Sequence, residues 1–217
     1  DFKAIKALLK KPAFTDDEIS TVPALNRTDF PLADVDSLMA AGWPKAAGIE
    51  ARAVLAVTTY LGAIDFADHK TATYDSIQKR EYHHIFPDAL LSEAEIPSYL
   101  ALNCALITWK TNRMIGRKDP LEYLQERVQW ADEAVVRDRL KSHLISFDLL
   151  SKAHYATLDG ASLKQKLTED FNGFLRDRAK LVVAAMASLT AGNSPSLETL
   201  WSAHLADANT SKAEAEA

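Results

Sequence analysis

Glycine, cysteine and long apolar runs are all scarce in this chain of 217 residues. Seven glycines are few for an all-β protein, because its many tight turns need residues that tolerate positive φ. The only cysteine, Cys104, excludes an intrachain disulfide, and a lone thiol in an apolar run is typical of a reducing cytoplasm. Apolar runs such as Leu181 to Leu189 are much shorter than the roughly 20 residues of a membrane-spanning helix. We therefore expect a cytoplasmic protein that does not contact the membrane.

The start of the chain lacks two further features. No basic segment followed by an apolar stretch opens it, so the sequence predicts no signal peptide. The first residue is Asp1 rather than methionine. We therefore expect this chain to be a piece of a longer protein.

Acidic residues outnumber basic ones by 30 to 25, which gives a formal net charge of -5. Because polyanion-binding proteins carry positive charge where they bind, any nucleic-acid site here must be a local basic patch. Hydrophobic residues make up 47% of the chain, enough for one domain with a real core.

Helical periodicity dominates the sequence, since alanine, leucine and long charged residues favour helix. Thr15, followed by three acidic residues, predicts a capped helix start. Two short segments, Glu81 to Pro87 and Cys104 to Trp109, have the β-branched and aromatic composition of strands. We predict one mostly helical domain over residues 1–217, with helices near 1–11, 45–64, 162–191 and from Ser194-Pro195 onward, and a disordered tail at 206–217.

The residues that carry chemistry collect around the two strand segments. Two adjacent histidines, His83 and His84, precede Pro87, and two asparagines, Asn103 and Asn112, follow. A neutral imidazole can accept a proton from water near neutral pH. A second imidazole and an amide oxygen can hold a divalent ion that offsets charge on a phosphate. These residue types suit phosphodiester hydrolysis, although neighbouring strand residues point to opposite faces and would need a twisted strand end to converge.

The stretch 79–124 resembles the core of HNH, or His-Me finger, nucleases, in which a β-hairpin and a helix hold one metal ion. Three motifs carry the resemblance, in this order: His-His-Ile-Phe-Pro, Leu-Asn-Cys-Ala-Leu-Ile and Asn-Arg-Met-Ile-Gly-Arg-Lys-Asp-Pro-Leu-Glu-Tyr-Leu. They are similar to the C-terminal nuclease domain of GmrSD-type and SspE-type phage-defence enzymes. The resemblance implies a mainly α fold with an embedded ββα-metal unit, an α+β arrangement.

The resemblance also implies a role for each residue of the motif. His83 would bind the metal ion, and His84 would be the general base. Asn103 would brace the loop between the strands, and Asn112 would complete the metal site. An asparagine in the last position of the HNH pattern favours Mg²⁺ or Mn²⁺ over zinc.

The function that the resemblance implies is metal-dependent DNA cleavage, one strand at a time. Such enzymes carry an N-terminal domain that hydrolyses nucleotides and senses modified DNA, with an Asp-Gly-Gln-Gln-Arg motif that this sequence lacks. We therefore expect the effector domain of a bacterial anti-phage restriction system. Its expected partners are DNA and the sensing domain of the same protein.

A basic run follows the second strand segment. Lys110, Arg113, Arg117 and Lys118 occur with no acidic residue between them. Beside a metal site they would contact phosphates on either side of the cut, and a solvated surface is the alternative interpretation. His69 could be a further phosphate contact, or an ordinary surface residue.

Two other functions remain open on the sequence. One is a non-catalytic DNA-binding or docking module that keeps the nuclease fold, although the intact His84 argues against it. The other is a metal-independent ribonuclease, because Arg137 and His143 have the spacing found in helical HEPN ribonucleases. Such a pair arises readily in a charged helix, so a surface helix is the better interpretation.

Overall fold

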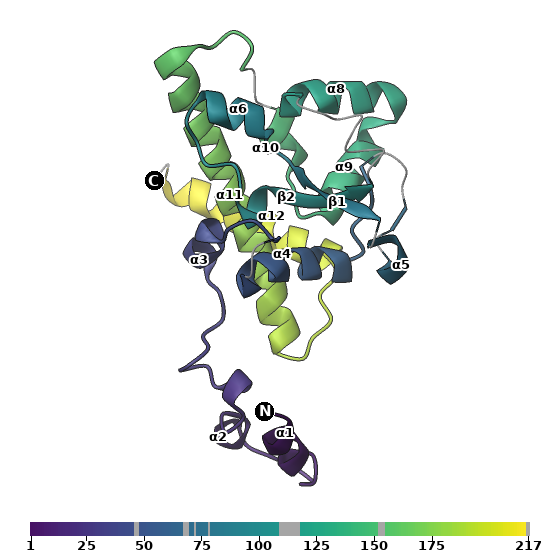
Figure 1. Cartoon of the computed structure of the whole chain (residues 1–217), viewed down its shortest axis with the longest axis vertical. Coiled ribbons are helices and arrows are strands. Elements are labelled where there is room, and N and C mark those ends of the chain that lie inside the picture. The colour runs from purple at the N-terminus through teal and green to yellow at the C-terminus, as the bar shows by residue number, and fades with distance from the viewer. Residues whose placement is uncertain are drawn as a thin grey trace. The chain divides into compact units, whose positions relative to one another are not determined.

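Figure 1 shows the computed structural model of the chain, which is mainly helical. The structure describes residues 1–45, 48–66, 70–71, 73–77, 79–108, 118–151 and 155–215. The chain forms two units, Asp1–Ala33 and Asp34–Ala217, where the sequence predicted one domain. The segment around the boundary, 31–34, has no regular secondary structure, and Pro31 lacks the backbone donor that a helix would need.

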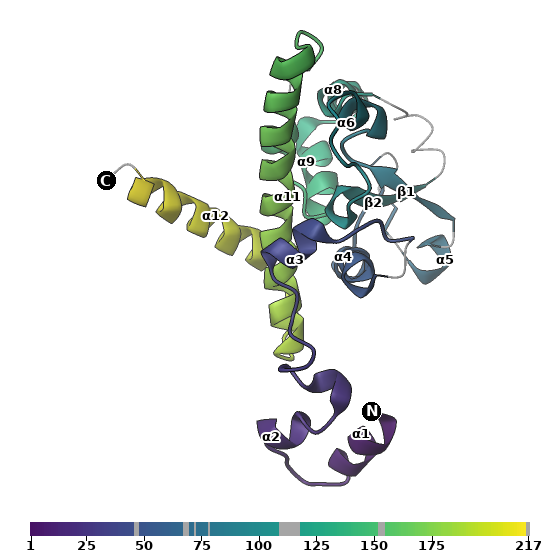
Figure 2. The same cartoon turned by 60° about the vertical axis from the view of Figure 1, so that its left-hand side comes forward.

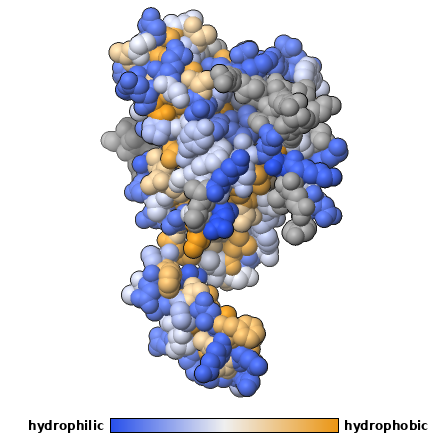
Figure 3. Space-filling model, in the orientation of Figure 1, coloured by the Kyte–Doolittle hydropathy of each residue, from blue (hydrophilic) through white to orange (hydrophobic). Residues whose placement is uncertain are grey.

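The first unit contains two short helices, α1 (Phe2–Leu8) and α2 (Asp16–Ile19). Thr15 caps α2 as the sequence predicts: its hydroxyl accepts from the Glu18 amide, and the Glu18 carboxylate accepts from the Thr15 amide. Several large apolar side chains of this unit are exposed, and Figure 3 shows them as orange patches on its surface. A unit of this size buries few apolar side chains.

The second unit is built along one long helix, α11 (Gly160–Thr190), and Figure 2 shows the strands and several helices on one side of it. Its buried residues recur at the three- and four-residue spacing of a helix face, which confirms the helix predicted near 162–191. The rings of Phe171 and Phe174 lie 5.1 and 5.2 Å from the ring of Phe86. The core therefore lies between α11 and the segment that follows the first strand.

Two strands form the small sheet, β1 (Arg80–His84) and β2 (Cys104–Thr108). They are antiparallel, and the register pairs Arg80 with Thr108 and His84 with Cys104. Both predicted strand segments are thus confirmed, with ends that differ by a few residues. The sheet and its helical surroundings make the fold α+β.

The remaining elements surround this centre. The loop from β1 to β2 contains α6 (Asp88–Glu93) and a 3₁₀ helix at Ala101–Asn103. The other described elements of the second unit are α3 (Val35–Ala40), α4 (Ile49–Tyr60), α5 (Tyr74–Ile77), α8 (Pro120–Trp130), α9 (Glu133–Ser142) and α10 (Phe147–Ser151). The first unit also contains the 3₁₀ helix Pro23–Leu25.

The last helix, α12 (Leu197–Ala215), differs from the prediction in two ways. It continues through residues predicted to be a disordered tail, because the alanine-rich sequence there favours helix. It begins at Leu197, after the predicted Ser194-Pro195, and Ser196 caps it, since the Thr199 amide donates to the Ser196 hydroxyl at 3.2 Å. Within the described ranges, none of the helices is long and apolar enough to cross a membrane.

Candidate functional site

The first histidine of the motif, His83, is buried on one face of the strand pair. Its side chain is 3% exposed. The rings of Phe66 and Tyr123 lie edge-on to it, each with its centroid 6.4 Å away. Tyr123 comes from α8, so this face of β1 is the one that α8 covers.

The second histidine, His84, lies among aromatic rings. The indole of Trp43 stacks on its imidazole at 4.1 Å with an 18° angle between the planes. The ring of Tyr99 meets the imidazole edge-on at 4.8 Å. The two histidines thus contact different rings on opposite faces of β1, as strand alternation requires, and they do not converge on one point.

The surroundings of His84 favour its neutral form. Burial lowers the pKa of this imidazole below its ordinary value, and the negative charge of nearby Asp88 opposes the shift only in part. The Nε2 atom is enclosed and has no hydrogen-bond partner among the described residues. A neutral imidazole at pH 7 is able to accept a proton.

The amide of Asn103 ties together the two ends of the loop between the strands. Its Oδ1 accepts from the Phe86 amide at 2.8 Å. Its Nδ2 donates to the carbonyl oxygens of Phe86 and Ser98, both at 3.0 Å. The side chain is fully buried, so these contacts are shielded from water. This bracing position is the one that the resemblance implies for Asn103.

The sequence did not predict that Trp43 and Tyr99 contact His84. The segment before Trp43 reaches the loop through a short β-bridge between Gly42 and Leu100, and the Ala101 amide donates to the Ala41 carbonyl. Their separation along the chain leaves no periodic signal. The only local signal was the Gly-Trp-Pro sequence after the preceding helix. It predicts a turn but not which residues the turn contacts.

A buried polar cluster holds the opposite end of the strand pair. The Thr108 amide donates to the Asp65 carboxylate, which is fully buried. The guanidinium of Arg139 donates to the Phe66 carbonyl at 2.6 Å, and that of Arg80 donates to the Leu106 and Lys70 carbonyls at 3.2 and 2.9 Å. These bonds fix the end of β2, from which the chain leads toward the predicted basic run.

A buried arginine supports the beginning of β2 from α11. Arg178 donates through Nη1 to the carbonyls of Leu102 at 2.6 Å and Cys104 at 2.9 Å, and through Nε to the carbonyl of His143 at 3.1 Å. Burial lowers its pKa to about 10, which leaves it charged at neutral pH. The long helix therefore positions the start of β2, directly after Asn103.

Several predicted site residues lie outside the described residues: His69, Lys110, Asn112, Arg113 and Arg117. The remaining member of the basic run, Lys118, forms an ion pair with Glu126 of α8. Its charge is thus shared with a carboxylate before any phosphate approaches.

The described residues contain one of the two metal ligands that the resemblance implies, His83. No group of three or more His, Cys, Asp or Glu side chains in the described part of the chain could hold a metal ion. One imidazole does not hold Mg²⁺ by itself, because that ion needs an octahedral set of mainly oxygen ligands. The described side chains alone therefore do not form a metal site.

The Arg137 and His143 pair of the ribonuclease alternative is not brought together. His143 is buried, and its Nε2 donates to the Ile64 carbonyl at 2.8 Å. Burial lowers its pKa to about 3. Arg137 instead forms surface ion pairs with Glu133 and Asp148, at 2.7 and 2.9 Å. The interpretation as a surface helix therefore holds for Arg137 but is wrong for His143.

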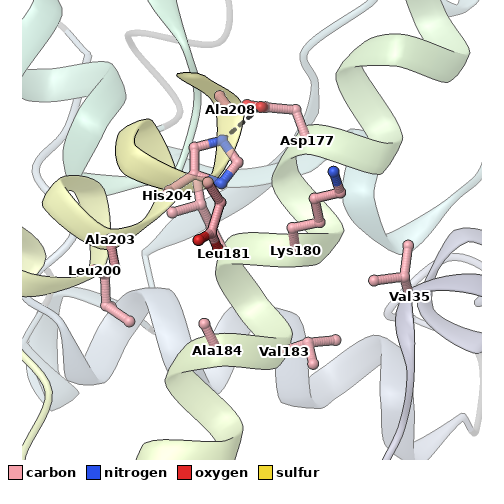
Figure 4. A pocket seen from close by; sticks show the side chains of 11 residues that line it. Val35, Asp177, Lys180, Leu181, Val183, Ala184, Leu200, Ala203, His204 and Ala208 are labelled. Atoms are coloured by element: carbon pink, nitrogen blue, oxygen red, sulfur yellow. Dashed lines mark hydrogen bonds and ion pairs between the residues drawn. The ribbon is translucent and has the colours of Figure 1, made fainter. Parts of the chain in front are cut away.

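A separate pocket of about 370 Å³ lies where α11 meets α12 (Figure 4). His204 Nε2 and Asp177 Oδ1, both in its lining, are hydrogen-bonded at 2.6 Å, and Lys180 also lines the pocket. No serine, threonine or cysteine is among the described residues that line it. The pair therefore joins the two helices rather than forming a nucleophilic triad.

The chain matches no family model, and no solved structure matches it. An uncharacterized protein of Methanocaldococcus jannaschii is 32% identical to it over 126 residues, which covers 51% of this chain. The match spans only 21% of that protein's length. This relative therefore indicates shared ancestry with part of a longer chain and names no activity.

Proposed function

We propose that this chain is a metal-dependent DNA endonuclease of the HNH type, which nicks one strand at a time. The observation that supports this best is the Asn103 amide, whose three hydrogen bonds close the loop directly behind His84. A side chain that takes a proton from water must be held in a fixed position. The antiparallel strand pair and the Asn103 hydrogen bonds would hold His84 in this way.

In this proposal the chain's own residues perform the proton transfer. The imidazole of His84, kept neutral by burial, takes a proton from the water that attacks phosphorus. His83 and Asn112 would hold Mg²⁺ or Mn²⁺, which would offset negative charge on the phosphate and on the departing 3′ oxygen. Lys110, Arg113, Arg117 and Lys118 would contact the neighbouring phosphates.

The proposed biological role is the effector half of an anti-phage restriction enzyme. Nucleotide hydrolysis and the sensing of modified DNA would belong to an N-terminal domain of the same protein. The archaeal relative, which is several times longer than the matched region, is compatible with such an arrangement.

A second candidate is a non-catalytic DNA-binding or docking module. One observation favours it, namely that His83 and His84 face opposite sides of β1 rather than one phosphate. For the nuclease to act, the scissile phosphate must lie across the end of the strand, where both side chains are within reach.

Relaxation of supercoiled plasmid in Mg²⁺ or Mn²⁺ tests the proposal. We expect wild type to convert the plasmid to open circles, and His84→Ala or added EDTA to abolish conversion. His204→Ala is the matched histidine control, because His204 lies in the separate α11–α12 pocket, and it should nick like wild type.

Other outcomes assign the chain differently. DNA retention on a gel without nicking by any variant would favour the binding module. Equal nicking by wild type and His84→Ala would mean that His84 is not the base. RNA cleavage that survives EDTA but is lost in Arg137→Ala would favour the ribonuclease.

A further inference from the structure

The rings around His84 form a cluster, partly exposed, that the proposed nuclease chemistry does not use. We define the aromatic cluster as Trp43, Tyr82 and Tyr99. The ring centroids of Tyr82 and Tyr99 lie 6.4 and 5.4 Å from that of Trp43. We propose that this cluster stacks an unpaired nucleobase, so that the substrate is DNA with single-stranded or locally opened nucleotides at the cut. The inference rests on the proposed nuclease function.

Tyr99 is the most accessible member of the cluster. It is 57% exposed, although it contacts both Trp43 and His84. Trp43 and Tyr82 are half-buried. A large aromatic side chain left in water beside other rings commonly marks a binding surface. The Tyr99 ring lies 4.8 Å from the imidazole that would act on the phosphodiester bond.

The backbone presents Tyr99 from a tight, braced turn. The Leu100 amide donates to the Ser98 carbonyl at 2.9 Å, which closes the turn around Tyr99. The same carbonyl accepts from the Asn103 amide at 3.0 Å, and the Ser98 hydroxyl donates to Asp88. The ring is therefore held in place before any ligand binds, which reduces the entropy lost on stacking.

A positive charge accompanies the rings. The Lys45 ammonium lies 5.4 Å from the centroid of the Tyr82 ring. Aromatic rings for bases and a cation for the backbone are the two components of single-strand binding sites. On a chain of net charge -5, stacking has to supply much of the affinity that a uniformly basic surface would obtain from phosphates.

The cluster selects for unpaired nucleotides because of what a duplex leaves accessible. Base faces inside a duplex are covered by their neighbours, so a ring can stack only on a base that is unpaired, flipped or at an end. Phosphates, in contrast, are equally available in both forms. A contact that depends on Tyr99 should therefore discriminate between the two.

Fluorescence anisotropy with a labelled oligothymidylate of about 12 nucleotides tests this inference, with the same strand annealed to its complement as the duplex probe. EDTA prevents cutting during the measurement. We expect tighter binding of the single strand. Tyr99→Ala should weaken it about fivefold or more while leaving duplex binding unchanged, and Tyr99→Phe should bind like wild type. Tyr60→Ala is the matched control, because Tyr60 is 56% exposed but lies outside the cluster.

The inference is overturned if the single strand does not bind, or if Tyr99→Ala binds it as tightly as wild type. It is also overturned if Tyr60→Ala loses as much affinity. The plasmid assay separates this from failure of the nuclease proposal. Single-strand binding that depends on Tyr99, without plasmid nicking, would support the base-stacking inference and contradict the nuclease proposal. Plasmid nicking, with no effect of Tyr99→Ala on single-strand binding, would support the nuclease proposal and contradict the base-stacking inference.

Discussion

Arg178 gives a prediction at the scale of one residue, because its guanidinium serves three backbone carbonyls inside the core. In Arg178→Met those carbonyls lose their donors, while the burial of a charge is relieved. We expect the free energy of unfolding to fall by about 2 kcal/mol. Arg176→Met is the control, since Arg176 is on the surface of α11 and its loss should cost less than about 0.5 kcal/mol. Equal urea midpoints for the two variants would contradict the role given to Arg178.

His143 makes stability depend on pH. Its pKa of about 3 in the folded protein lies below the ordinary 6.5, so the unfolded chain takes up a proton at pH 5 that the folded chain excludes. Stability from this group is fully present above pH 6.5 and is lost as pH falls toward 3. Between pH 7 and pH 5 the loss is about 2 kcal/mol. Urea unfolding should show a shallower pH dependence in His143→Gln than in wild type, and parallel curves would contradict the prediction.

At the scale of an element, the loop between β1 and β2 depends on the amide of Asn103. Asn103→Asp keeps an acceptor for the Phe86 amide but cannot donate to the Phe86 and Ser98 carbonyls. We expect a loss of about 3 kcal/mol in unfolding free energy, together with faster hydrogen exchange at the Phe86 amide. Asn172→Asp, on the exposed side of α11, makes the same change of side chain and should be nearly neutral. Similar losses of unfolding free energy in both variants would mean that the loop does not depend on the Asn103 hydrogen bonds.

The elements show where sequence reasoning succeeds. Both strands and α11 were predicted because their composition and period are local properties. The bracing role of Asn103 was implied by the resemblance, whose motifs are local too. Trp43 and Tyr99 could not be predicted, because a ring contact between residues 56 positions apart leaves no pattern in either segment. His143 was wrongly placed on the surface, since a charged helix does not reveal which of its polar residues finds a buried carbonyl.

At the scale of the whole molecule, the boundary between the two units should be the first site of proteolysis. Leu32 and Tyr99 are both exposed, at 41% and 57%, and chymotrypsin can cut after either. The segment around Leu32 has no regular structure, whereas the turn at Tyr99 is held by hydrogen bonds. We therefore expect brief digestion to release a fragment that begins after Leu32, as mass spectrometry would identify. Initial cutting at Tyr99 would contradict the braced loop.

The boundary also marks a limit of prediction from sequence. Composition indicated enough apolar residues for one domain, but it does not specify how they divide among cores. Exposed side chains such as Phe2 and Leu9 follow the same helical period as buried ones, so their pattern predicts a helix but not how deeply its apolar face is buried.

The single cysteine allows the opening of the strand pair to be measured by thiol labelling. Cys104 is fully buried at the start of β2, and burial raises its thiol pKa to about 12, so the native protein should resist thiol reagents. Labelling can occur only when the strand pair opens. With a fast reagent the labelling rate becomes the opening rate, and with a slow one it reports the fraction of molecules open at any moment. No engineered probe is needed to time the opening of the segment that carries His84 and Asn103.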